Sequence, residues 1–232
     1  MPKLITEFAS TLQYHINLNS KLFKNNKLKK EVRDRTLKLA YLFAADCNID
    51  QRIILDVYLV GGNANFNYTD SSDIDIHILI DFKKINSGDI DLSDYFKAKK
   101  DLWSTNHSVT LYGYDTELYI QNITEPHPSG QGIYSILHQR WIVQPEKVQI
   151  NYDDPKLISK VEKYIEAIDN LSSIHDARKL KDKFKKMRTV GIQRSGEFSI
   201  ENLVFKELRN LGYIKKLDDK YKFIRDSKLT LK

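Results

Sequence analysis

The sequence predicts an α/β (α+β) fold, in which a small mixed β-sheet with flanking helices is followed by a helical C-terminal region. Between residues 53 and 121, runs rich in β-branched and aromatic residues alternate with a stretch of helical periodicity. From Pro155 onward, apolar residues recur every three or four positions, as in amphipathic helices. The 232 residues, 41% of them hydrophobic, suffice for one or two domains with a buried core.

The first third of the chain predicts an arm, a helix and a strand. Residues 1–30 mix apolar and polar residues without a clear period and carry a turn signal at Asn25 and Asn26, so we expect an N-terminal arm. Residues 31–47 lack Gly and Pro and have apolar residues at helical spacing, which predicts a helix. Residues 53–60 (IILDVYLV) predict a buried strand that ends at two glycines.

The segment over residues 73–82 (DIDIHILIDF) alternates strictly and predicts a second strand. A period of two places Asp73, Asp75 and His77 on one face and four isoleucines on the other. Further along, the pattern predicts a helix over residues 92–105, strands over 108–112 and 116–121, and a short helix or strand ending at Pro145.

The C-terminal region predicts helices over residues 157–171, 174–190 and 199–212, with a break over 191–198. We therefore expect three parts: an N-terminal arm (1–30), a catalytic domain (31–152) and a basic helical region (153–232).

Positive charge is concentrated in that last region. Residues 156–232 hold 20 Lys and Arg against 11 Asp and Glu, whereas the whole chain has a net charge of only +6. Lys181, Lys185 and Arg188 recur at spacings of four and three and so share one helix face. Such a face fits a clamp for a triphosphate or a nucleic acid, although a solvated Lys-rich surface is the interpretation that we favour.

Several protein classes are excluded or not expected. The sequence has no run of eighteen apolar residues, which excludes a membrane helix, and the first residues do not resemble a secretory signal. Because Cys47 is the single cysteine, the chain has no intrachain disulfide and no cysteine zinc cluster. We expect a cytoplasmic protein without membrane contact.

The paired carboxylates of the second strand predict a cation site. Residues two apart in a strand project from the same face about 6.5–7 Å apart, so Asp73 and Asp75 can reach the same cations. Gly61 and Gly62, ten residues upstream, allow a phosphate to approach the backbone closely, and a helix starting near residue 63 would add partial positive charge. Ser71 and Ser72 offer hydroxyls beside the cations. We expect His77 to be a supporting or surface residue, because Mg²⁺ prefers oxygen ligands.

These residues carry a family resemblance. The pattern of Gly61, Gly62, ten residues and then Asp73-Ile74-Asp75 resembles the signature of the DNA polymerase β-like nucleotidyltransferase superfamily. The longer string LVGGNANFNYTDSSDIDIHILIDF is similar to predicted nucleotidyltransferases of tailed bacteriophages, as are ELYIQ and GEFSIENLVFKELR further along. Many superfamily members have Gly-Ser in place of Gly61-Gly62, so the second glycine would contact phosphate through its backbone N–H alone.

The resemblance implies a site and a reaction. Asp73, Asp75 and a third carboxylate on a neighbouring strand would hold two Mg²⁺ ions, with Mn²⁺ as the alternative ion. Glu117 matches the third position best, and Asp115 is its competitor on the same face. The implied reaction moves a nucleoside monophosphate from an NTP to a hydroxyl acceptor and releases pyrophosphate, in the host cytoplasm if the protein is phage-encoded.

Two alternatives of another class stay open: a non-catalytic module that binds nucleotide or nucleic acid, and a phage structural or assembly protein that retains the fold. The sequence identifies neither the acceptor, which a nucleic acid or a protein could provide, nor the base preference, nor the oligomeric state.

Overall fold

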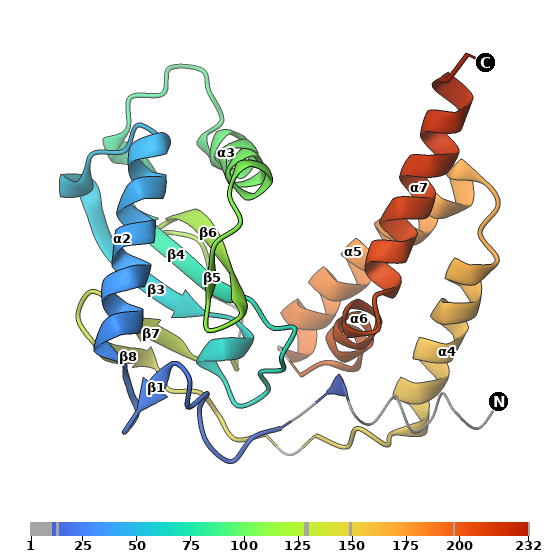
Figure 1. The fold of residues 1–232 in the computed structure, drawn as a ribbon, viewed down its shortest axis with the longest axis horizontal. Coiled ribbons are helices and arrows are strands. Elements are labelled where there is room, and N and C mark those ends of the chain that lie inside the picture. The colour runs from blue at the N-terminus through green and yellow to red at the C-terminus, as the bar shows by residue number, and fades with distance from the viewer. Residues whose placement is uncertain (1–10, 13, 128–129, 149, 197, 232) are drawn as a thin grey trace. The chain divides into compact units, whose positions relative to one another are not determined.

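The computed structural model of the protein describes residues 11–12, 14–127, 130–148, 150–196 and 198–231 (Figure 1). These residues form two compact units. The sheet unit comprises residues 14–127 and 131–147, and the helical unit comprises residues 11–12, residue 130 and the described part of 148–231.

The sheet unit is built on a mixed sheet with the strand order β5-β6-β4-β3-β7-β8. Its two central strands are β3 (Ile54–Val60) and β4 (Ile74–Ile80), which run antiparallel. The remaining strands are β5 (Thr110–Leu111), β6 (Tyr114–Asn122), β7 (Ile133–Ser135) and β8 (Arg140–Val143). The β4–β6 pair is parallel, and every other pair in this sheet is antiparallel, so the expected mixed sheet is confirmed.

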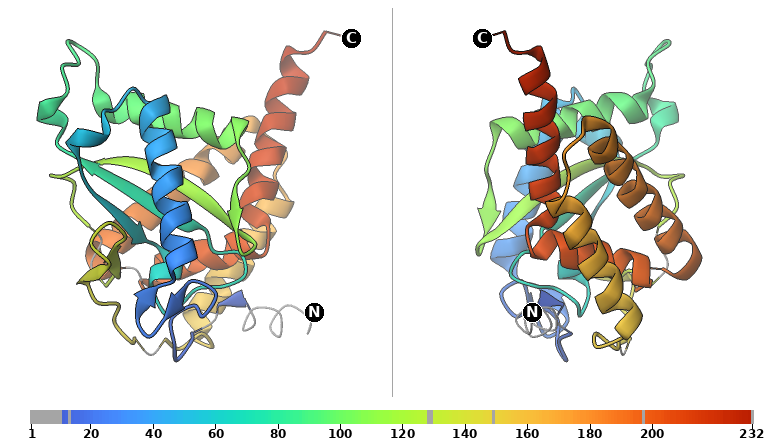
Figure 2. Two further views of the ribbon diagram at one scale, coloured as in Figure 1. Left: turned by 60° about the vertical axis from the view of Figure 1, so that its left-hand side comes forward. Right: turned by 90° about the vertical axis from the view of Figure 1, so that its right-hand side faces the viewer.

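Two helices pack on this sheet. Helix α2 (Lys30–Asp46) contacts β4 and β6, and α3 (Leu92–Asn106) contacts β6 (Figure 1). Figure 2 shows α3 running across the direction of α2. The four isoleucines of β4 are completely buried in one core with α2, so the alternate residues of β4 point to the opposite face of the sheet.

The strand that carries the aspartates is shorter than expected. β4 begins at Ile74, so Asp73 precedes the strand, and Phe82 already belongs to a short 3-10 helix, η3 (Phe82–Lys84). The side chain of Asp81 ends the strand by accepting a hydrogen bond from the Lys83 N–H at 3.0 Å. Another 3-10 helix, η1 (Gln51–Ile53), precedes β3.

Part of the expected N-terminal arm belongs to the sheet unit. A small hairpin of β1 (Phe23–Lys24) and β2 (Lys27–Leu28) turns at Asn25 and Asn26, whose φ angles of 52° and 60° confirm the turn signal. Its apolar residues are buried in the sheet core, which explains why this segment is not a free arm; they include Leu22, Phe23 and Leu28. Residues 1–10 of the expected arm lie outside the described residues.

The helical unit confirms the expected helical C-terminal region (Figure 2). Its helices are α4 (Pro155–Asp169), α5 (Ile174–Ser195), α6 (Ile200–Asn210) and α7 (Tyr213–Leu229). The break expected from residue 191 is wrong, because α5 continues to Ser195. Gly191 is buried where α5 meets the start of α6, and a Cβ atom there would lie 2.7 Å from the Cβ atom of Glu201. The glycine therefore permits close packing instead of ending the helix.

The unit boundary also differs from the expected one, since residues 148 and 150–152 belong to the helical unit, where Ile150 and Tyr152 pack on its core. Within the described residues, no helix is both long and apolar enough to cross a membrane.

Candidate functional site

Asp75 and Glu117 lie side by side on neighbouring strands of the sheet. They are register partners in the parallel pair of β4 and β6, and such partners project from the same face of a sheet. Their side chains are hydrogen-bonded to each other, with the Asp75 carboxyl donating to the Glu117 carboxylate. Two acidic groups that share a proton in this way are in effect one negative charge.

The surroundings push the two pKa values in opposite directions. Burial raises the pKa of Asp75 far above its ordinary value, and the negative charges of Glu117 and Asp73 raise it further. Burial alone would also raise the pKa of Glu117, but the hydrogen bond and charge of the Lys100 ammonium outweigh it and lower that pKa. The proton therefore stays on Asp75, and Glu117 is the ionised partner.

Lys100 was not expected from the sequence. It projects from α3 and forms an ion pair with Glu117, and its ammonium lies 5.7 Å from the centre of the Tyr119 ring. The lysine belongs to the run Lys-Ala-Lys-Lys (97–100), and only the packing of α3 on the sheet selects the one that faces the carboxylates.

The turn after β3 lies directly against the carboxylates. Gly61 has φ +74°, a conformation that favours glycine, and a Cβ atom on it would lie 1.7 Å from Oδ2 of Asp75. A Cβ atom on Gly62 would lie 3.0 Å from Oγ of Ser72, and this hydroxyl accepts a hydrogen bond from the Thr69 N–H at 2.9 Å. Ser72 is buried and Ser71 is exposed.

No regular helix follows the glycines. A helix starting near residue 63 would have added positive charge at this turn, but the segment forms only the three-residue 3-10 helix η2 (Gly62–Ala64), which is too short to provide a helix dipole for a phosphate. Any phosphate contact at this turn would come from individual backbone N–H groups.

Side-chain hydrogen bonds of two buried asparagines, Asn63 and Asn65, hold the connection between β3 and β4 in place. Asn63 donates to the Asp73 carbonyl at 2.9 Å and accepts from Asn19 at 2.7 Å. Asn65 donates to the Gly61 carbonyl at 2.7 Å and accepts from the Gly132 N–H at 2.8 Å. These residues were not singled out from the sequence as positioning residues, although a polar Asn-x-Asn next to paired glycines was the available signal.

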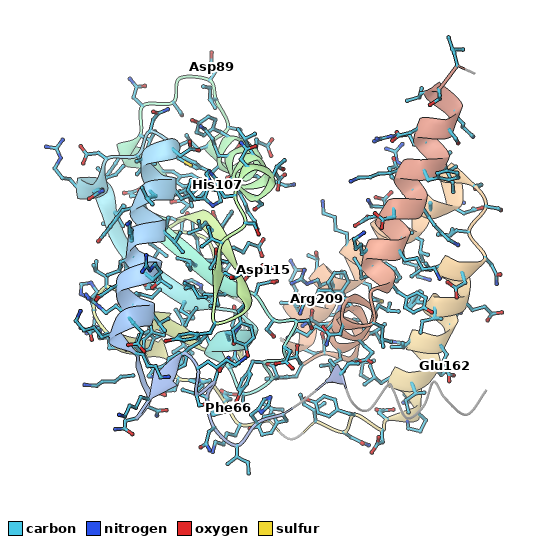
Figure 3. The ribbon with its side chains drawn as sticks, in the orientation of Figure 1. Phe66, Asp89, His107, Asp115, Glu162 and Arg209 are labelled. Carbon is cyan, nitrogen blue, oxygen red and sulfur yellow. The ribbon has the colours of Figure 1, made fainter. Side chains whose placement is uncertain are left out.

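A cavity of about 310 Å³ opens beside the carboxylates. It is lined by Asp73, Ser104, His107, Ser108, Val109, Asp115, Thr116 and Glu117. Figure 3 labels two of these residues, His107 and Asp115, where α3 and β6 meet the cavity. Asp115 is exposed and pairs with Thr110 on β5. The register partner of Asp75 in the β4–β6 pair is Glu117 and not Asp115.

His77 follows Asp75 by two residues on β4 and therefore projects from the same face of the sheet. Its Nδ1 atom is 2.8 Å from Oε1 of Gln121, and its ring meets the Tyr119 ring edge-on. Burial lowers the pKa of His77 to about 4, so the ring is neutral near pH 7 and adds no positive charge to the site.

The expected basic residues are all on α5, in the helical unit. Lys181 forms an ion pair with Asp218 at 2.6 Å, and the Arg188 guanidinium lies 4.9 Å from the centre of the Phe205 ring. Lys185 is exposed. These contacts fit a solvated helix surface at least as well as a phosphate clamp.

The donor set has the chemistry that Mg²⁺ prefers, because Asp73, Asp75 and Glu117 are all carboxylates. Their arrangement does not form a complete site. Among the residues that the structure describes, no three His, Cys, Asp or Glu side chains are placed so that they could hold a metal ion. The shared proton and the Lys100 ion pair occupy the carboxylates instead.

The chain matches no protein-family model and no curated protein. It has a weak likeness to the STING-associated CdnE c-di-GMP synthase from Capnocytophaga granulosa, with 13% identity over 87% of this chain and 84% of that chain and a TM-score of 0.21. The Rhodothermus marinus CdnE c-UMP-AMP synthase with Apcpp and Upnpp is also 13% identical, over 94% of this chain and 81% of that chain, with a TM-score of 0.25. At such TM-scores, neither likeness carries an argument about the activity of this chain.

Proposed function

We propose that the chain is a nucleotidyltransferase that moves a nucleoside monophosphate from an NTP to a hydroxyl acceptor and releases pyrophosphate. The observation that carries the proposal is that Asp75 and Glu117 are register partners on parallel strands. Asp73 is close enough to raise the pKa of Asp75, and the backbone of Gly61 lies against the Asp75 carboxyl group. The sequence motif that these residues form supports the same reaction.

Electrostatics favours a cation at this cluster. Placing carboxylates next to one another is unfavourable unless positive charge compensates them, and the negative charges of Glu117 and Asp73 accordingly raise the pKa of Asp75. Asp73, Asp75 and Glu117 would hold the two Mg²⁺ ions, or Mn²⁺ in their place. Bound divalent ions stabilise charge on the phosphates and lower the pKa of the attacking hydroxyl.

The chain itself would position the substrates. In this proposal the triphosphate would bind backbone N–H groups of the Gly61-Gly62 turn, with the hydroxyl groups of Ser71 and Ser72 as further donors. The cavity beside Asp73 and Glu117 is lined by several hydroxyl-bearing side chains, which suit a polar acceptor. Glu117 is the third carboxylate in this proposal, because it is the register partner of Asp75.

The basic residues of the helical unit have a secondary role in this proposal. Lys181, Lys185 and Arg188 would contact a nucleic-acid acceptor, and a protein acceptor is the other class. A phage origin and a cytoplasmic location rest on the sequence alone and stay predictions.

The test is label transfer from NTPs labelled at the α-phosphate, incubated with Mg²⁺ and with RNA, DNA or protein from bacterial cells. We expect label on one acceptor class with the wild type and none with Asp75→Asn. Absence of transfer with every NTP and acceptor class contradicts the proposal.

The Lys100–Glu117 ion pair favours a second candidate, a nucleotide-binding module without catalysis. That candidate predicts a rise in melting temperature with NTP but no label transfer.

A further inference from the structure

The ammonium group of Lys100 contacts the carboxylate cluster in this structure. It forms an ion pair with Glu117, the register partner of Asp75, and lies 5.7 Å from the centre of the Tyr119 ring. The carboxylate pair is therefore already in contact with one positive charge that belongs to the protein.

A divalent cation at this cluster would need the same Glu117 carboxylate. A metal ion held by Glu117 would lie close to the Lys100 ammonium, which already contacts that carboxylate, and two cations at one carboxylate repel each other. We propose that Lys100 is a built-in competitor of the metal, so that the Lys100–Glu117 ion pair must open before Glu117 can bind Mg²⁺. This inference rests on the proposed function, because it assumes that the carboxylates bind a metal.

The position of Lys100 suits this role. Its side chain is 27% exposed, so it is neither sealed in the core nor free in solvent. The side chain of a lysine has a flexible four-carbon stem, so rotation about its bonds allows the ammonium to leave the carboxylate without movement of α3. Glu117 lines the neighbouring cavity, so solvent can reach its carboxylate.

The adjacent lysine provides a matched control. Lys99 lies on the same helix, its side chain is 22% exposed, and it pairs with Asp46 at 3.7 Å and with the Asp46 carbonyl at 2.7 Å. A substitution of Lys99 changes the net charge by the same amount as one of Lys100, but it leaves the Asp75–Glu117 pair untouched.

The first experiment is a direct Mn²⁺ titration, followed by electron paramagnetic resonance of the free ion, on the full chain without nucleotide. We expect Lys100→Met to bind Mn²⁺ about tenfold more tightly than the wild type, since it removes a competing cation. Lys100→Arg should stay near the wild type, and Lys99→Met should change the affinity by less than about twofold. Equal or weaker binding by Lys100→Met than by Lys99→Met would overturn the inference.

Asp75→Asn separates this result from a failure of the proposed function. If the wild type binds Mn²⁺ and Asp75→Asn does not, the carboxylates are a metal site, and the Lys100 result alone decides the inference. If no variant binds Mn²⁺, both the metal site and the competition fail.

A second measurement follows the lysine itself. Reaction with an amine-specific acylating reagent, quantified by mass spectrometry as the ratio of Lys100 to Lys99 labelling, reports how free each ammonium is. We expect Mg²⁺ to raise this ratio several-fold in the wild type and to leave it unchanged in Asp75→Asn. A ratio that does not respond to Mg²⁺ in a protein that binds Mn²⁺ would contradict displacement of Lys100.

Discussion

The Oδ2 atom of Asp75 lies where a side chain on Gly61 would begin, 1.7 Å from the position of a Cβ atom there. The Asp75 carboxyl group therefore packs directly against the turn that ends β3. The two meet because Val60 and Asp75 are register partners in the antiparallel pair of β3 and β4. A glycine here does two things: it adopts φ +74°, and it leaves room for the Asp75 carboxyl group.

This relationship predicts a large effect of Gly61→Ala. At φ +74° and ψ −164° a non-glycine residue is strained by about 1–3 kcal/mol, and the overlap with Asp75 must add to that by displacing the carboxyl group or the turn. We expect a loss of at least about 3 kcal/mol in unfolding free energy and loss of Mn²⁺ binding. Because both tryptophans, Trp103 and Trp141, are in the sheet unit, tryptophan fluorescence in urea reports its unfolding.

Gly113→Ala is the matched control for backbone strain. Gly113 has φ +86° in the β5–β6 turn, but a Cβ atom there meets nothing within 4 Å. This variant should lose only the about 1–2 kcal/mol of the positive φ and keep its Mn²⁺ binding. Equal losses for both variants would show that the contact with Asp75 costs nothing.

Asp75→Asn should stabilise the protein while removing its activity. The amide cannot ionise, so it removes the unfavourable proximity to Glu117 and Asp73 that raises the pKa of Asp75. We expect a gain of about 1–2 kcal/mol in the presence of a chelator, measured by urea unfolding at pH 8, and a fall in nucleotidyl transfer of at least about 100-fold.

Asp115→Asn, an exposed position on the same strand as Glu117, tests whether that gain is specific. Its stability should stay within about 0.5 kcal/mol of the wild type. A stabilisation as large as that of Asp75→Asn would mean that general negative charge is responsible, and not the proximity of Asp75 to Glu117 and Asp73.

The helical unit has its own predicted pH dependence through Glu207. Burial raises the pKa of this carboxyl group from its ordinary value of 4.5 to about 7, although a hydrogen bond from the Thr11 hydroxyl lowers it in part. The folded state therefore binds the proton more tightly than the unfolded state. Stability from this group is complete below about pH 4.5 and is lost as the pH rises through about 7.

Glu207→Gln should remove this pH dependence, because the amide stays neutral. We expect the variant to exceed the wild type in stability by about 1–3 kcal/mol at pH 8 and to approach it below pH 5. Circular dichroism in urea at both pH values measures the difference. Glu162→Gln, at an exposed position of α4 labelled in Figure 3, should change stability by less than about 0.5 kcal/mol at either pH.

The sequence predicted those features that depend on local pattern. Strict alternation over residues 73–82 identified the buried isoleucine face, because the side-chain period of a strand is two. The two asparagines of the β1–β2 turn were recognisable because Asn tolerates positive φ.

Features that depend on packing between distant segments could not be predicted in the same way. Gly191 resembles a helix breaker in the sequence, yet it is a point of close approach between α5 and the residues that begin α6. The choice of Lys100 among three neighbouring lysines depends on the rotation of α3 over β6, which no local pattern contains. The pairing of Asp75 with Glu117 requires a parallel register between strands about forty residues apart, a choice that the residues alone leave open.

Asn63 links this packing to the site and gives the last prediction. Its buried amide joins Asn19 to the carbonyl of Asp73, so it holds the residue at which the chain enters β4. Asn63→Ala leaves a buried donor on Asn19 and a carbonyl acceptor without partners, at a cost of about 1–3 kcal/mol, measured by tryptophan fluorescence in urea. Because Asp73 is then less well positioned, Mn²⁺ affinity should also fall several-fold, whereas Asn86→Ala, at an exposed position, should change neither quantity. A destabilised Asn63→Ala protein with unchanged Mn²⁺ affinity would show that Asp73 needs no such support, or that it is not a ligand.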